Sequence, residues 1–142
     1  NAFGLVQGKA NQVEGGKRPL SSMSPSMLLD DDGDVFMVTG SPGGSTIIST
    51  TLESMINVLD FDMNIQQAVN APRLHNQWLP DVTRVETGYL TPDTRKALEA
   101  MGHSFKESDS WGADEAVLVD PATGKRHGAN DRRRPAGLAE GF

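Results

Sequence analysis

The segment Thr39-Gly40-Ser41-Pro42-Gly43-Gly44 has the strongest potential for chemistry in this 142-residue chain. The first N–H groups of a helix lack acceptors within it, and glycines have no Cβ to keep a ligand away from such groups. Two adjacent amides at Gly43 and Gly44 could therefore bind the oxyanion of an acyl transfer or a phosphate. A nucleotide site is disfavoured, because no Lys follows the glycines and no G-x-G-x-x-G spacing is present. Taken alone, the two glycines are equally well explained by a tight turn.

Adjacent hydroxyls at Ser21 and Ser22 form a second candidate site. A desolvated hydroxyl can donate a hydrogen bond to a carboxylate, so the pair could hold an acidic substrate group. Ordinary turn or cap chemistry is the alternative. A nucleophilic serine is not favoured, because the sequence has no G-x-S-x-G motif.

Composition limits the other classes of function. A formal charge of −6 and a pI near 4.9 argue against a nucleic-acid surface, and the one basic run, residues 132–134, is interpreted as a solvated tail or as internal ion pairs. The chain has no Cys, and its three His residues lack metal-ligand spacing, so no metal or cofactor is expected. No apolar run is long enough to span a membrane.

The glycine loop and the serines must be positioned by surrounding strands and helices. Short apolar runs at 27–29 and 35–38 predict a β-hairpin buried on both faces, around an acidic segment that is interpreted as a turn rather than a calcium loop. Beyond the glycine loop, Ile48, Leu52, Met55, Ile56 and Leu59 recur at helical spacing. Further helices are predicted at 65–70 and from Thr91-Pro92-Asp93 to Gly102, with strands at 83–86, 104–107, 116–119 and 126–129. Residues 1–18 are predicted to form a mobile loop, and the whole chain is expected to be a single α/β unit.

Four segments together resemble the γ-glutamyltranspeptidases: KRPLSSMSPSMLL at 17–29, VTGSPGGSTIISTTLESMINVLD at 38–60, NAPRLHNQWLPD at 70–81 and GANDRRRPAGLAEGF at 128–142. The resemblance implies an N-terminal-nucleophile hydrolase, whose fold is a four-layer αββα sandwich of α+β type that this chain would only partly supply. Residues 1–142 would be the C-terminal part of the small subunit, with residues 1–18 as a lid-loop remnant and connector.

The resemblance also implies roles for particular residues. Ser21 and Ser22 correspond to the pair that holds the substrate α-carboxylate, and Gly43 and Gly44 to the backbone oxyanion hole. The nucleophile is a threonine at the start of the small subunit, which this chain lacks, so we expect the chain alone to be inactive. Its expected partners are the large subunit, the missing N-terminal part of the small subunit, a γ-glutamyl substrate such as glutathione, and an acceptor amino acid or water. Periplasmic or secreted location is implied in the same way.

Two alternatives remain open at the level of sequence. The chain could belong to a related acylase acting on glutaryl or poly-γ-glutamyl substrates, or to a noncatalytic, degenerate binding module with the same fold. The run at 111–116, Trp-Gly-Ala-Asp-Glu-Ala, departs from the Gln-containing run more usual in the family, which bears on the choice of acceptor.

Overall fold

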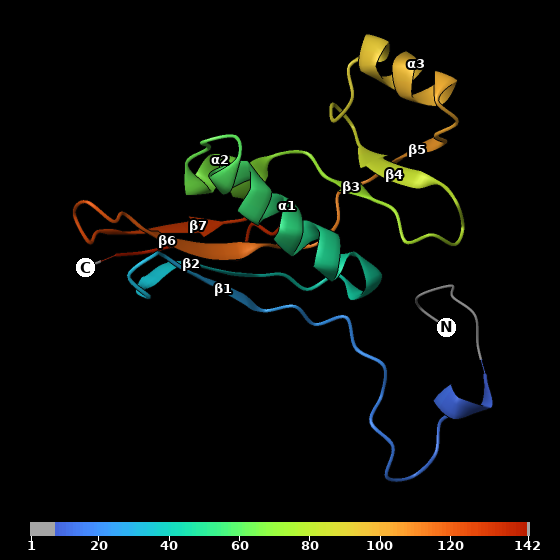
Figure 1. Ribbon diagram of the computed structural model, residues 1–142, viewed down its shortest axis with the longest axis horizontal. Helices are drawn as coiled ribbons and strands as arrows, with labels where there is room; N and C mark the ends of the chain where they lie inside the picture. Colours follow the sequence, from blue (N-terminus) through green and yellow to red (C-terminus); the bar gives the residue numbers. More distant parts are fainter. Residues whose placement is uncertain (1–7, 142) are drawn as a thin grey trace.

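Two small β-sheets organise the chain in the computed structural model, which describes residues 8–141 (Figure 1). The first sheet is antiparallel and has the order β1-β2-β6-β7, comprising β1 (Ser26–Leu29), β2 (Val35–Gly40), β6 (Glu115–Val119) and β7 (Arg126–Asn130). The second has the order β3-β4-β5, comprising β3 (Leu74–His75), β4 (Thr83–Glu86) and β5 (Phe105–Ser108). The helices are α1 (Ile47–Leu59), α2 (Ile65–Asn70) and α3 (Pro92–Ala100), with 3₁₀ turns η1 (Lys9–Asn11) and η2 (Gly44–Thr46).

Most of the predicted elements are confirmed. The mixed α and β class is correct, the hairpin forms, and α2 has the predicted bounds. Helix α3 begins as expected, because the Thr91 side chain accepts a hydrogen bond from the Thr94 N–H and Pro92 occupies the first turn. The acidic segment is a turn, in which Asp30 Oδ1 accepts the N–H groups of Asp32 and Asp34. The two-residue strand β3 and both 3₁₀ turns were not predicted.

Helices α1 and α2 cover one face of the four-stranded sheet (Figure 1). The hydrophobic core lies between them and consists of Met37, Val58, Ile65, Ala68, Val69, Ala116 and Ala129. The short helix α2 is set by a capping box, in which Asn64 and Gln67 satisfy each other's backbone N–H groups. This packing places the loop between β2 and α1 at the end of the sheet.

The prediction that the hairpin strands are buried on both faces is wrong. Met27, Val38 and Val117 lie side by side across three strands, because Val38 pairs with both of the others. Their exposed fractions are 60%, 38% and 39%. On this face the C-terminal segment reaches Gly128, the partner of Val117, where a Cβ would lie 3.0 Å from Ala139 Cβ. The apolar residues Met27, Val38 and Val117 stay partly exposed, so they form a surface that a further layer would bury.

Helix α1 also differs from expectation in the face that it buries. The apolar positions Ile48, Leu52 and Leu59 are about half exposed. The helix instead buries Thr50, Thr51 and Ser54 together with Ile47 and Val58. The helical period was correct, but the face that packs toward the sheet is the one that carries the hydroxyls, of which Ser54 interacts with Asp114.

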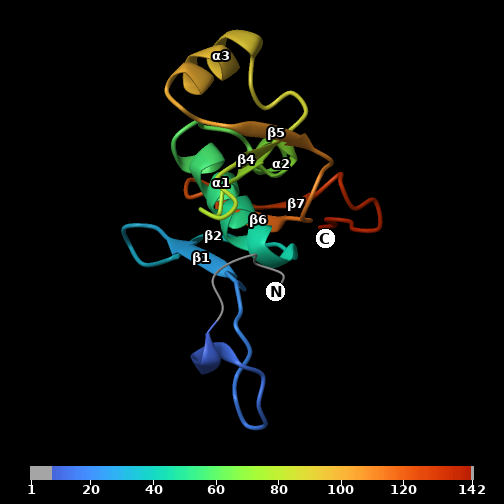
Figure 2. The same ribbon diagram turned by 90° about the vertical axis from the view of Figure 1, so that its right-hand side faces the viewer.

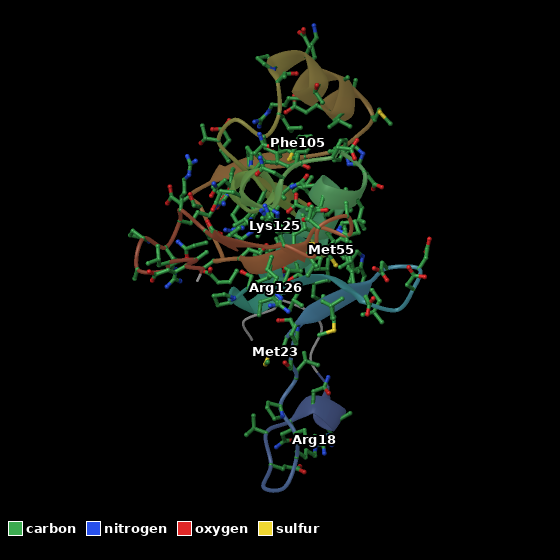
Figure 3. All side chains as sticks on the ribbon, turned by 90° about the vertical axis from the view of Figure 1, so that its left-hand side faces the viewer. Arg18, Met23, Met55, Phe105, Lys125 and Arg126 are labelled. Atoms are coloured by element: carbon green, nitrogen blue, oxygen red, sulfur yellow. The ribbon has the colours of Figure 1, made fainter. Side chains whose placement is uncertain are left out.

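The chain before β1 extends away from the sheet (Figure 2). Residues 8–20 are exposed and contain only the turn η1. Figure 3 places Arg18 on the projecting part and Met23 nearer the sheet. The predicted lid-loop remnant falls partly on residues 1–7, which lie outside the described residues, and its mobility is untested.

Candidate functional site

The glycine turn follows β2 directly and is exposed. Gly43 has φ 151° and ψ 6°, and Gly44 has φ 59°, so both occupy backbone conformations that favour glycine. The turn η2 begins at Gly44, and α1 starts only at Ile47. The two amides therefore belong to a 3₁₀ turn and not, as predicted, to the first turn of the long helix.

The N–H groups of Gly43 and Gly44 lie on one side of the turn. A ψ near 0° eclipses the nitrogen of Gly43 with the nitrogen of Gly44, so both N–H groups lie on the same side of the Gly43 Cα–C bond. Within residues 8–141 neither N–H donates to a protein acceptor. Successive free N–H groups in such a turn form a small anion-binding concavity.

The paired serines lie against this turn. Ser22 Oγ donates to the carbonyl of Gly44, across a separation of 22 residues. Ser21 is exposed, and its Oγ accepts the N–H of Met23 at 3.2 Å, which leaves its own proton free. The structure thus brings together the two predicted groups, with the difference that the Ser22 proton is already engaged by a backbone carbonyl.

The loop before β6 supports the start of the glycine turn. Ser41 Oγ accepts the N–H of Ala113 at 3.0 Å. Gly112 has φ +74°, and a Cβ built on it would lie 2.9 Å from Ser41 Oγ and 3.2 Å from Arg73 Nη1. Glycine at 112 therefore allows three segments distant in sequence to pack closely.

A buried ionic network contacts the loop before β6. Arg73 Nη2 contacts Asp131 Oδ2 at 2.7 Å, and their side chains are 3% and 0% exposed. Arg73 Nη1 donates to the carbonyl of Trp111 at 2.7 Å. Arg133 joins the network by pairing with both Asp131 and Glu86. The interpretation of the basic run as internal ion pairs is thus confirmed for Arg133, whereas Arg132 and Arg134 are exposed.

The charges in this network depend on their hydrogen bonds. Burial alone would raise the pKa of Asp131, but N–H donors from Arg133 and Asp114 and the Arg73 guanidinium outweigh it and lower that pKa. Burial also works against the charged form of Arg133, yet bonding to Glu86 and Asp131 raises its pKa. Both groups are therefore held in their charged forms.

Buried hydroxyls of α1 and β2 lie next to this network. Asp114 is fully buried, and its Oδ1 accepts the Thr39 hydroxyl at 2.8 Å. Burial raises the pKa of Asp114, against the effect of hydroxyl bonds from Ser54 and Thr39. The Thr50 and Thr51 hydroxyls face the same side of α1 and have no hydrogen-bond partner among the described residues.

The carboxyl of Glu53, which is partly buried, lies on α1. Its Oε1 accepts the N–H of Leu74 at 2.9 Å, which ties α1 to β3. Burial raises the pKa of Glu53 to about 7 from its ordinary 4.5, despite the opposing effect of that hydrogen bond. Burial and the neighbouring Glu53 carboxylate together raise the pKa of Tyr89 to about 12.

The described histidines do not converge. His75 is buried, with Nδ1 2.9 Å from Ser49 Oγ and Nε2 3.1 Å from Gln77 Oε1. His103 is exposed in the loop between α3 and β5, and His127 is exposed on β7. Across residues 8–141 no group of three or more His, Cys, Asp or Glu side chains is arranged to hold a metal ion, and none of the helices there is long and apolar enough to cross a membrane.

A shallow cavity of about 360 Å³ opens elsewhere, between β5 and the Glu86–Arg133 pair. None of Ser21, Ser22, Gly43 or Gly44 lines it. The proximity of the serines and glycines therefore rests on the Ser22 to Gly44 hydrogen bond and not on an enclosed pocket within this chain.

Sequence reasoning missed the supporting residues of this site. Ser41 and Thr46 flank the two glycines, but their hydrogen bonds to carbonyls of the turn produce no repeating pattern of residue types that could be recognised in the sequence. Arg73 and Asp131 stand within two of the segments that carry the family resemblance, NAPRLHNQWLPD and GANDRRRPAGLAEGF. That position could have marked them as structural or functional.

Comparison with known proteins gives consistent results. The family model for gamma-glutamyltranspeptidase matches residues 1–141. The chain is 47% identical over its whole length to the glutathione hydrolase proenzymes of Pseudomonas sp. (strain A14) and Escherichia coli (strain K12), of which it covers 26% and 24%. It thus spans about a quarter of the length of these relatives.

A solved structure shares the fold. The T380A mutant of Helicobacter pylori gamma-glutamyltranspeptidase superposes with a TM-score of 0.88 at 46% identity, covering 94% of this chain and 73% of that one. The superposition therefore includes nearly all of the chain.

Proposed function

Because this chain belongs to the γ-glutamyltranspeptidase family, with the N-terminal-nucleophile hydrolase fold, we propose that it supplies two parts of a γ-glutamyl acyl-transfer site. Gly43 and Gly44 donate N–H hydrogen bonds to the oxyanion. Ser21 and Ser22 bind the α-carboxylate of the γ-glutamyl group, Ser21 with its free hydroxyl proton and Ser22 by turning its proton from the Gly44 carbonyl to the carboxylate when the substrate binds. The substrate class is the γ-glutamyl amides, glutathione among them.

One observation carries this proposal: Ser22 donates a hydrogen bond to Gly44, so the hydroxyl pair and the free N–H pair lie within one side-chain length of each other. An acyl donor that bears its own carboxylate needs both kinds of group at once. Binding the distal carboxylate fixes the orientation of the donor, and the N–H groups then act on charge that develops only in the transition state.

In the proposed reaction a threonine hydroxyl, from a part of the enzyme outside this chain, attacks the γ-carbonyl carbon. The threonine O–C bond forms as the hydroxyl gives up its proton, and the carbonyl oxygen becomes an oxyanion. The amide C–N bond then breaks as the oxyanion returns to a carbonyl and the leaving amine takes up the proton that the threonine released. The resulting γ-glutamyl-threonine ester is resolved by water, which gives glutamate, or by an amine, which gives a new γ-glutamyl amide.

The chain then acts only within an assembly. We propose that residues 1–142 form the C-terminal part of a small subunit, with 1–18 leading from a lid loop, and that a large subunit completes the site. The apolar face formed by Met27, Val38 and Val117 supports this, since it offers the surface that a second sheet of an αββα sandwich would cover. A periplasmic or secreted location accords with the family.

The test is kinetic and uses the complete enzyme that contains this segment. Kinetics with γ-glutamyl-p-nitroanilide and glutaryl-p-nitroanilide would distinguish the γ-glutamyl site from a glutaryl acylase, since both substrates carry the distal carboxylate but only the first has an α-amino group beside it. We expect kcat/KM to favour the γ-glutamyl compound strongly. A preference for the glutaryl compound would contradict the proposal, and no turnover of either would support a noncatalytic module.

A matched pair of glycine variants tests the oxyanion role. Gly44 and Gly124 have similar φ values, 59° and 67°, and a Cβ built on either meets no atom within 4 Å. Gly44→Val and Gly124→Val thus impose similar backbone strain. Valine keeps the backbone N–H, but at position 44 its side chain would obstruct the approach of the substrate carbonyl to the two donors. We therefore expect only Gly44→Val to reduce kcat, by about 10²-fold or more, a loss comparable with that of an oxyanion donor. Equal kcat in the two variants would count against the role.

A further inference from the structure

We infer that the side-chain hydroxyls of Ser41 and Thr46 are positioning groups that aim the N–H donors of Gly43 and Gly44, an inference that rests on the proposed acyl-transfer function. Neither hydroxyl is proposed to contact the substrate. Each acts on a carbonyl of the glycine turn, and through it on the N–H at the other side of the same peptide bond.

The first peptide unit joins Pro42 to Gly43. Ser41 Oγ donates to the Pro42 carbonyl at 2.7 Å. A trans peptide is planar, and its C=O and N–H point in opposite directions. Fixing the Pro42 carbonyl toward Ser41 therefore directs the Gly43 N–H away from it.

Ser41 is itself held in place. Its Oγ accepts the N–H of Ala113, and Gly112 packs so closely that a Cβ there would lie 2.9 Å from the hydroxyl oxygen. The Arg73 guanidinium holds the Trp111 carbonyl one residue earlier. The hydroxyl thus joins the glycine turn to the buried ionic network.

The second peptide unit joins Gly43 to Gly44. The Gly43 carbonyl accepts both the N–H of Thr46, at 3.2 Å, and the Thr46 hydroxyl, at 3.0 Å. Thr46 is only 3% exposed, so water competes little for this bond. A Cβ on Gly43 would lie 2.6 Å from Thr46 Oγ1, so the missing side chain is what allows the hydroxyl to approach.

The third carbonyl of the turn, that of Gly44, accepts the hydroxyl of Ser22. Three successive carbonyls, of Pro42, Gly43 and Gly44, are therefore each bonded to a side-chain hydroxyl, while the N–H groups of both glycines have no protein acceptor within residues 8–141. A turn stabilised only for its own sake would not need this division, in which every acceptor is used and both donors are left open. An oxyanion site does, because its donors must be oriented before the reaction begins.

The experiment measures kcat and KM for γ-glutamyl-p-nitroanilide in the complete enzyme, with thermal unfolding midpoints alongside. For Ser41→Ala and for Thr46→Val we expect kcat to fall by about 10-fold or more with KM changed less than about 2-fold, since misaimed donors weaken transition-state binding alone. The conservative variants Ser41→Thr and Thr46→Ser retain the hydroxyl and should restore most of kcat. Ser26→Ala is the control, because its hydroxyl also donates to a carbonyl, that of Ser24, at 3.1 Å, but this carbonyl precedes β1 and is not one of the three in the glycine turn.

The outcomes separate this inference from the function on which it rests. A wild-type enzyme that does not turn over γ-glutamyl amides refutes the proposed function. An active wild type whose Ser41→Ala and Thr46→Val variants keep kcat, or lose it no more than Ser26→Ala does, overturns the inference alone. So does a loss of kcat that the conservative variants fail to restore, or one that appears as a rise in KM.

Discussion

Asp131 offers the sharpest test of how the site is supported. Its carboxylate is fully buried and accepts hydrogen bonds from the Arg73 guanidinium, the Arg133 guanidinium and backbone, and the Asp114 N–H. Asp131→Asn keeps the size of the side chain but removes the charge and replaces one acceptor oxygen with an amide that can only donate. Arg73 would then remain buried beside a repelling donor or a neutral acceptor.

The expected cost follows from this geometry. Breaking a buried ion pair by removing one partner typically destabilises a protein by about 3–5 kcal/mol, because the other charge is left uncompensated. At 1.36 kcal/mol per factor of ten, this is roughly a 10²- to 10⁴-fold change in the opening equilibrium of the region. Native-state hydrogen exchange of peptides covering β6 and β7 in the complete enzyme would measure it as faster exchange.

The matched control is Glu99→Gln, also an acid-to-amide change. Glu99 pairs with Arg95 on the surface of α3, with side chains 47% and 32% exposed. Exposed pairs contribute about 0–1 kcal/mol, so exchange in α3 should change by a few-fold at most. If Asp131→Asn altered exchange in β6 and β7 no more than Glu99→Gln alters exchange in α3, the reasoning that the Arg73–Asp131 pair holds the loop before β6 would be refuted.

Three further predictions concern single features of the site. Because the folded-state pKa of Glu53 is raised to about 7 from 4.5, its contribution to stability is complete below about pH 4.5 and is lost as pH rises through 7. Glu53→Gln should flatten the pH dependence of the urea midpoint over this range, and an unchanged slope would contradict the assignment. Gly112→Ala should lower the free energy of unfolding by about 2–4 kcal/mol, because the added Cβ clashes with its neighbours and the backbone is strained. Gly88 has a similar φ but open space around it, so Gly88→Ala should cost only about 1 kcal/mol. Urea unfolding measures both values, and equal losses would count against close packing at Gly112. Replacing Ser21 and Ser22 together by Ala should reduce kcat/KM for γ-glutamyl-p-nitroanilide by about 10²-fold or more, while an unchanged value would reject carboxylate binding.

Local signals in the sequence were sufficient for most of the elements. Thr91-Pro92-Asp93 predicts the start of α3 because a cap, a fixed φ and a first-turn acid all act within a few residues. Short apolar runs around a turn predict the β1–β2 hairpin for the same reason. Each of these depends on neighbours in the chain, so the sequence alone was enough.

Burial could not be read in the same way. The apolar positions of α1, such as Ile48 and Leu52, have the correct period, yet the helix buries Thr50, Thr51 and Ser54 instead. The side of a helix that faces a sheet depends on what the sheet presents, here a face that includes the buried Thr39 and the neighbouring Asp114. Those partners lie up to 75 residues apart in the sequence.

The candidate site shows the same difference between local sequence signals and long-range contacts. The sequence by itself determined which residues are candidates for the chemistry, because paired serines and a glycine turn are local motifs whose residue types limit what they can bind. Only the tertiary structure decided that the Ser22 hydroxyl bonds to the Gly44 carbonyl and that the Ser41 and Thr46 hydroxyls bond to the other carbonyls of the turn. It also decided that the Arg73–Asp131 ion pair lies next to the loop that packs against this turn. These contacts join segments separated by loops and a sheet, and such proximity is set by how the whole core packs and not by any stretch of residues within it.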